Sequence, residues 1–184
     1  MRKRLATYNV VVATTLMLFS SLCIAASSQV LDEFSAMYKQ EWGVTQPCKN
    51  TRLNRKSVCS AVLRSEGNAP FVLQHDTPSK KVAVLIHGLS DSPFFMREIA
   101  NILYDEGFDV LVPLLPGHGL RDASDDMSDS DLAERWQAHI DDVLNLANSV
   151  ADTVIVGGFS TGGALAVEHY LDTDTGVDGL MLFS

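Results

Sequence analysis

The chain has 184 residues, with 14 lysines and arginines against 23 aspartates and glutamates, so its formal net charge is −9. This length is enough for one domain with a sizeable hydrophobic core. The excess of carboxylates argues against nucleic acid and anionic lipid as partners, because their phosphates repel an acidic surface at short range.

The first 26 residues are predicted to be a secretory signal peptide. A basic head at residues 2–4 precedes an apolar run at 10–24, and the small residues Ala25 and Ala26 follow. Cleavage there removes three basic residues and no acidic one, which changes the formal charge from −9 to −12. We therefore expect a periplasmic or extracellular protein. The alternative is an uncleaved membrane anchor formed by residues 8–26, which would be its one stable membrane contact.

Residues 27–60 are predicted to form an N-terminal extension. Apolar residues at helical spacing are Val30, Phe34, Met37 and Tyr38. In an exported protein, Cys48 and Cys59 are best interpreted as a disulfide that closes a small loop. Two free thiols or a metal-binding pair are the alternatives. A metal site needs about four ligands, and no nearby histidine or cysteine supplies the others.

From residue 61 onward, strand and helix patterns alternate, which predicts one α/β domain over residues 61–184. Short apolar pieces at 61–64 and 71–75 flank a hairpin-like break at 66–68. Strands are predicted at 81–87, 109–113, 153–159 and 179–183, and helices at 92–107, 132–147 and 161–171. Such alternation with short connections indicates a mostly parallel sheet with helices on both faces.

The turn between the third of these strands and its helix has the pattern G-x-S-x-G, formed by residues 158–162. In a tight strand–helix turn, side chains two positions either side of the serine would collide, and Gly158 and Gly162 remove them. Ser160 is then exposed at the carboxyl end of the sheet, where open α/β sheets place their sites. We therefore predict that Ser160 is a catalytic nucleophile.

A second group of residues follows the strand at 81–87. An acyl-transfer site needs two backbone N–H donors aimed at the oxyanion of the tetrahedral intermediate. In this architecture they come from the residue after the nucleophile, Thr161, and from the loop after this strand, at Leu89. Gly88 allows that loop to approach the substrate closely. His87 is interpreted as orienting the loop rather than as the general base.

Three segments, VLIHGLSDSP, LVPLLPGHGL and GGFSTGG, resemble the carboxylesterase and monoacylglycerol-lipase branch of the α/β-hydrolases, also called serine-aminopeptidase-like hydrolases. The resemblance covers residues 71–184. It implies the α/β-hydrolase fold, with Ser160 as nucleophile and the amides of Leu89 and Thr161 as oxyanion donors. It also implies that His118 is a structural loop residue.

The acid and histidine of a catalytic triad follow the serine in chain order in this fold. The acidic residues after Ser160 at 172, 174 and 178 fall at the wrong end of the sheet, and His169 lies too far along the helix. His75 and His139 are interpreted as solvated. We therefore expect the triad acid and histidine beyond residue 184, in C-terminal strands that this chain lacks. The chain alone, as a fragment, is then expected to be nearly inactive.

The sequence thus predicts a serine hydrolase that cleaves acyl esters, with a small acyl ester or lipid as substrate and neither metal nor organic cofactor. A non-catalytic binding module of the cell envelope is the alternative, as is a related amidase, peptidase or acyltransferase. Two neighbouring features remain open. Phe94 and Phe95 could line an acyl pocket or pack in the core. The acidic run at 122–131 does not match a calcium loop and is interpreted as a solvated segment.

Overall fold

The computed structural model describes residues 29–49, 54–123, 126–171 and 176–184. The predicted signal peptide and the acidic residues at 125, 172 and 174 lie outside these ranges. A helical segment over residues 29–36 comes first. The strands are β1 (Gln46–Pro47), β2 (Arg55–Cys59), β3 (Phe71–Leu73), β4 (Lys81–Ile86), β5 (Asp109–Val112), β6 (Thr153–Phe159) and β7 (Gly179–Phe183). The α-helices are α2 (Lys39–Trp42), α3 (Arg97–Asp105), α4 (Leu132–Val150) and α5 (Thr161–Leu171), and short 3₁₀ turns occupy Glu66–Asn68, Pro93–Met96 and Asp126–Ser128.

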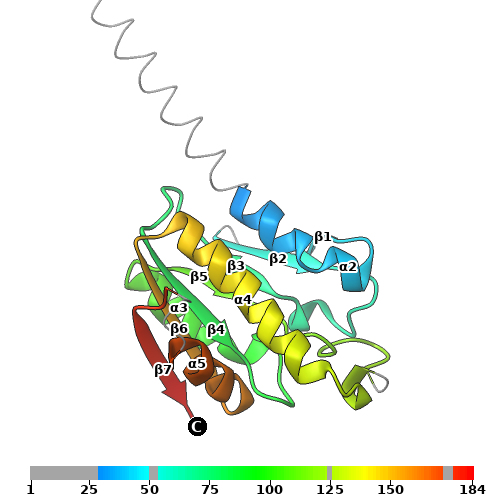
Figure 1. The fold of residues 1–184 in the computed structure, drawn as a ribbon. Helices are drawn as coiled ribbons and strands as arrows, with labels where there is room; N and C mark the ends of the chain where they lie inside the picture. Colours follow the sequence, from blue (N-terminus) through cyan, green and yellow to red (C-terminus); the bar gives the residue numbers. More distant parts are fainter. Residues whose placement is uncertain (1–28, 50–53, 124–125, 172–175) are drawn as a thin grey trace, which may run out of the picture.

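The described strands form one mixed sheet in the order β1-β2-β3-β5-β4-β6-β7 (Figure 1). β5, β4, β6 and β7 run parallel, and β1, β2 and β3 pair antiparallel at one side. β4 lies between β5 and β6, and its residues from Val82 to Ile86 are buried because both faces of the sheet are covered there. The predicted mostly parallel sheet with helices on both faces is confirmed.

Helices divide between the two faces of the sheet, as Figure 1 shows with α4 across one face and α3 behind the other. On the first face, Ile140 and Val143 of α4 and Ala166 of α5 share a buried cluster with β4. On the second face, Met96 and Ala100 pack against β3, β4 and β5. Side chains of β6 and β7 that face the α3 side are only half-buried. β4 is therefore covered by helices on both faces, whereas β6 is fully covered only on the side of α4 and α5.

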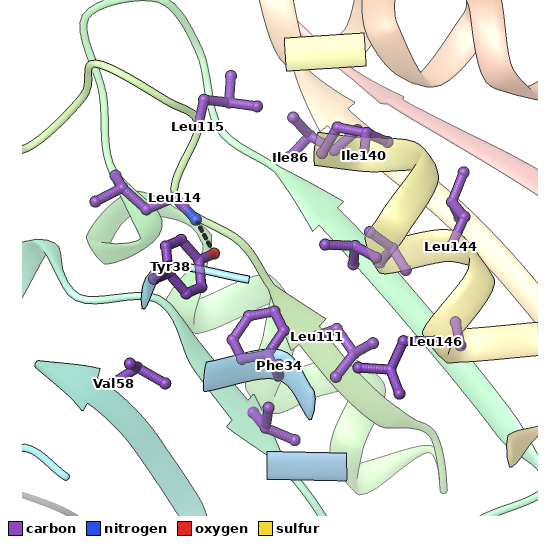
Figure 2. Close-up of a cluster of buried hydrophobic side chains, with 14 of the residues drawn as sticks. Phe34, Tyr38, Val58, Ile86, Leu111, Leu114, Leu115, Ile140, Leu144 and Leu146 are labelled. Atoms are coloured by element: carbon purple, nitrogen blue, oxygen red, sulfur yellow. Dashed lines mark hydrogen bonds between the residues drawn. The ribbon is translucent and has the colours of Figure 1, made fainter. Parts of the chain in front are cut away.

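The described part of the predicted extension packs in the same core as the sheet. Figure 2 shows Phe34 and Tyr38 lying against Leu111 and Leu114. The Tyr38 hydroxyl accepts a 3.0 Å hydrogen bond from the Leu114 amide and lies 3.2 Å from Nε2 of His139. Burial raises the pKa of Tyr38, so the hydroxyl stays protonated in its contacts with Leu114 and His139.

His139 is therefore not solvated, and that expectation was wrong. Its side chain on α4 is covered by the Tyr38 ring at 5.1 Å, and burial lowers its pKa to about 4. The spacing along α4 already places His139 beside its apolar stripe, four residues before the buried Val143, although the ring that covers it comes from a segment 101 positions earlier.

Cys48 and Cys59 form a disulfide, as predicted, which ties the segment after β1 to the end of β2. One other local expectation was wrong. The antiparallel partner of β3 is β2, whereas the piece at 61–64 contributes one bridge from Leu63 to Leu120. The segment after Ser92 begins as a 3₁₀ turn with Pro93 at its first position, and the Ser92 hydroxyl donates to the Asn68 side chain. None of the helices in the described ranges is long and apolar enough to cross a membrane.

Asp109, at the start of β5, organises the loop between β3 and β4. It is 5% exposed, and its carboxylate accepts hydrogen bonds from the amides of His75 and Ser79 and contacts Nδ1 of His75 at 2.7 Å.

We expect Asp109→Ala to lower the free energy of unfolding by about 3 kcal/mol, because two amides lose a charged acceptor. Asp105→Ala, at an exposed site on α3, is the matched control and is expected to change it by less than about 0.5 kcal/mol. Equal effects of the two changes in a denaturant titration would contradict this role.

Candidate active site

Ser160 lies in the turn between β6 and α5 and is exposed to solvent. Its φ angle is 53°, and among the described residues it is the one non-glycine residue with a positive φ. Such a conformation costs an L-residue roughly 1–2 kcal/mol, and it turns the side chain away from the path of the backbone. The strand enters and the helix leaves at this one residue, which presents the hydroxyl at the carboxyl end of the sheet.

The glycines on either side of the serine are places where two backbone segments touch. A Cβ on Gly158 would overlap the carbonyl of Gly162 and lie 2.6 Å from the nitrogen of Gly163. A Cβ on Gly162 would overlap the carbonyl oxygen of Ile86 and lie 2.5 Å from that of His87. The start of α5 therefore rests directly on the end of β4. Thr161 opens α5, whose first-turn amides have no partner within the helix and point toward Ser160.

His87 is fully buried at the end of β4, and both of its ring nitrogens are engaged. Nε2 accepts a 3.1 Å hydrogen bond from the Leu115 amide, so the proton is on Nδ1, which donates to the Gly88 carbonyl at 2.8 Å. Burial lowers the pKa of His87 to about 3. A histidine that stays neutral and has no free nitrogen cannot act as the general base, which agrees with its predicted place as a loop-orienting residue.

Gly88 and Leu89 follow in a turn closed by a 3.1 Å hydrogen bond from the Asp91 amide to the Gly88 carbonyl. A Cβ on Gly88 would lie 2.6 Å from a carboxylate oxygen of Asp91 and 3.0 Å from the ring of Phe159. Phe159 precedes Ser160, so the turn lies beside the serine. The backbone of Leu89 is thus placed at the same end of the sheet as Ser160 and Thr161.

His118 also reaches this turn, through a 2.8 Å contact between its Nε2 and the carbonyl oxygen of Leu89. The sequence interpretation as a structural loop residue did not include this contact. Its signal was nevertheless present, because the loops after β4 and β5 leave neighbouring parallel strands and must meet at one edge.

The other described histidines lie elsewhere. His75 pairs with Asp109 at the amino end of β5, and His169 of α5 lies 3.1 Å from Asp141. Asp178 bonds the Val154 amide at the amino end of β6, which confirms that it is at the wrong end of the sheet. Among the described residues, no histidine or carboxylate is hydrogen-bonded to the Ser160 hydroxyl.

Exposed apolar side chains follow the same turn. Leu89, Phe94 and Phe95, here called the apolar rim, are 46%, 50% and 60% exposed. The two phenyl rings stack edge to face at 5.4 Å, and the Arg97 guanidinium lies over Phe94. Packing of Phe94 and Phe95 in the core, one of the two sequence interpretations, is therefore wrong.

A mostly apolar cavity of about 240 Å³ lies at the opposite end of the sheet, lined in part by Val72, Val82 and Leu111.

The acidic run is partly an ion-pair network rather than a freely solvated segment. Arg135 of α4 contacts Asp126 at 3.4 Å, Asp129 at 3.0 Å and Glu41 of α2 at 3.6 Å. A hydrogen bond from the Asp131 amide, together with Arg135, lowers the pKa of Asp129. In the described ranges, no group of three histidines, cysteines or carboxylates is arranged to hold a metal ion.

Comparison with known proteins agrees with this geometry. The sequence pattern of the Alpha/beta hydrolase family matches residues 83–183, more than half of the chain. A thermostable monoacylglycerol lipase from Bacillus sp. (strain H-257) is 30% identical over 92 residues, which are 48% of this chain and 36% of the lipase.

Two solved structures are also similar. One comes from work on the metagenome-derived lipolytic enzymes LipS and LipT, with a TM-score of 0.56 and 29% sequence identity. The matched region covers 66% of this chain and 46% of the solved chain. A lipase in an open form has a TM-score of 0.50 and 23% identity, covers 76% of this chain and 44% of its own, and supports the fold alone. The chain thus spans between about a third and a half of the length of these relatives. From its sheet, its strand–helix turn at Ser160 and its matched sequence pattern, the chain belongs to the α/β-hydrolase family.

Proposed function

We propose that the protein is a serine hydrolase that cleaves acyl esters, with Ser160 as the nucleophile. The observation that supports this most is the left-handed backbone at Ser160, which exposes a hydroxyl where two loops and a helix N-terminus meet. The lipase and the lipolytic enzymes among the relatives favour an ester as the substrate. The apolar rim beside the turn favours an apolar acyl group.

In the proposed reaction, Oγ of Ser160 attacks the carbonyl carbon of the ester, and the carbonyl oxygen becomes an oxyanion. The amides of Leu89 and Thr161 donate hydrogen bonds to that oxygen. A histidine takes the proton of the serine and gives it to the departing alcohol as the carbon–oxygen bond breaks, which leaves an acyl group on Ser160. Water, activated by the same histidine, then releases the acid and restores the serine.

We propose that this histidine and its acid partner come from outside the 184 residues. The described histidines are engaged elsewhere, and the relatives are more than twice as long as the matched region. We also propose that the protein is exported, because disulfides such as that between Cys48 and Cys59 persist in oxidising compartments.

The test uses protein expressed from its complete coding sequence. We expect a fluorophosphonate probe to label it, and nitrophenyl esters to be hydrolysed. Ser160→Ala is expected to abolish labelling and to lower kcat at least about 10³-fold, because the nucleophile is removed. The 184-residue chain alone is expected to be at least about 10³-fold slower than the complete protein, because the base is lacking.

Ser149→Ala, which changes an exposed serine on α4, is the matched control and should retain full labelling and activity. A complete, folded protein that neither binds the probe nor hydrolyses esters would favour the non-catalytic binding module. Release of product from amides but not esters would instead indicate an amidase.

A further inference from the structure

We propose that His118 is a positioning residue that, together with His87, holds the backbone N–H of Leu89 in the direction an oxyanion requires. The inference rests on the proposed function, because it assigns Leu89 as a donor. A peptide group is planar, and in its trans form the C=O and N–H bonds point in opposite directions. Whatever fixes the Gly88 carbonyl therefore also fixes the direction of the Leu89 N–H.

The Gly88 carbonyl oxygen is fixed from two sides. It accepts a 2.8 Å hydrogen bond from Nδ1–H of His87 and a 3.1 Å hydrogen bond from the Asp91 amide. His87 is itself held by the Leu115 amide, which bonds its Nε2 at 3.1 Å. The peptide before Leu89 is thus connected to the loop that follows β5.

The peptide after Leu89 is fixed by His118. Nε2 of His118 lies 2.8 Å from the Leu89 carbonyl oxygen, and a carbonyl can only accept, so in this contact the nitrogen is the donor. Nδ1 lies 3.1 Å from the Pro116 carbonyl, which already accepts a 2.9 Å hydrogen bond from Nε1–H of Trp136. Of the two contacts, the one to Leu89 is the shorter.

The two histidines act on consecutive peptides and support each other. Their rings meet edge to face at 5.0 Å, and the other side of His118 faces Trp136 at 5.4 Å. His118 is 5% exposed, so its position is set by packing. Leu89, by contrast, is 46% exposed and gains little from packing of its own. The hydrogen bonds to its two flanking peptides are therefore what holds it.

Loss of the His118 donor should loosen the oxyanion donor without removing the substrate contacts of the apolar rim. In protein from the complete coding sequence, we expect His118→Phe to lower kcat for ester hydrolysis about 30- to 100-fold with KM within about twofold. His118→Gln places an amide donor near the position of Nε2 and is expected to restore most of kcat. A residue that served only the stability of the loop would not show this split between kcat and KM or this rescue.

The matched control is Trp136→Phe. It removes the hydrogen bond to Pro116 and keeps an aromatic ring, but it does not touch Leu89. We expect its kcat to stay within about threefold of the parent. Equal losses in kcat for His118→Phe and Trp136→Phe, or no loss in either, would overturn the inference.

A second measurement does not depend on activity. Amide hydrogen exchange in residues 87–92 should be at least about tenfold faster in His118→Phe than in the parent, and unchanged in His118→Gln. A parent protein that hydrolyses nothing and binds no probe would refute the proposed function, and exchange would still decide whether His118 holds the turn. Unchanged exchange in His118→Phe would overturn the inference even in an active enzyme.

Discussion

Gly162→Ala is expected to lower the free energy of unfolding by at least about 3 kcal/mol, although alanine is the better helix former. The added Cβ would meet the carbonyl oxygens of Ile86 and His87, which belong to the central strand and cannot move aside. Helix propensity alone predicts the opposite sign, a gain of up to about 1 kcal/mol. A denaturant titration of the parent and the variant therefore separates packing from propensity.

Gly163→Ala is the matched control, one position further along the same helix. Its Cβ would lie 3.2 Å from the Gly158 carbonyl oxygen and 3.7 Å from the next atoms. We expect a change in the free energy of unfolding of less than about 1 kcal/mol, since the gain in propensity offsets the close contact. Similar destabilisation by both variants would mean that positions 162 and 163 are equally intolerant of a side chain, and the specific contact of Gly162 with β4 would not explain the loss.

Acidification from pH 7 to pH 5 is expected to lower the free energy of unfolding by about 3 kcal/mol through two buried histidines. Burial lowers the pKa of His87 to about 3 and that of His139 to about 4, against about 6.5 for either ring in the unfolded chain. Between those values the unfolded state binds more protons than the folded state. Stability therefore falls as pH falls through 6.5, and the loss continues down to the folded-state pKa values.

Urea titrations at half-unit pH steps measure this slope. His139→Gln removes one of the two titrating rings, and it should reduce the slope between pH 6 and pH 5 by about half, whatever its effect at pH 7. His75→Gln is the comparison, because the His75 side chain is 32% exposed and so is not buried as His87 and His139 are. A slope unchanged in His139→Gln would show that other groups cause the acid sensitivity.

The strands and the turn at Ser160 could be predicted because their signals are local. Residues 82–86 are apolar without interruption, and such a run has few alternatives to a strand covered on both faces. Likewise, Gly158 and Gly162 follow from the tightness of one turn, and their collisions involve backbone within that turn or directly beneath it. Gly162 also meets a distant segment, since its Cβ would overlap backbone at the end of β4.

The errors have the opposite origin. His139 was predicted to be solvated although it stands four residues before Val143, beside the apolar stripe of α4, and the ring of Tyr38 covers it from far away in the chain. The pairing of β3 with β2 and the bond from Ser92 to Asn68 also join segments whose proximity depends on how the sheet is ordered. The contact between His118 and Leu89 belongs to the same class, since it links loops that follow two different strands.

The left-handed backbone at Ser160 also determines which residue is most stable at this position. Glycine adopts a φ of 53° without strain, so replacing Ser160 by glycine would relieve roughly 1 kcal/mol and keep the turn. If the hydroxyl had no use, the lower backbone strain alone would favour glycine at position 160. Serine at this position is a residue that the fold tolerates rather than one it requires.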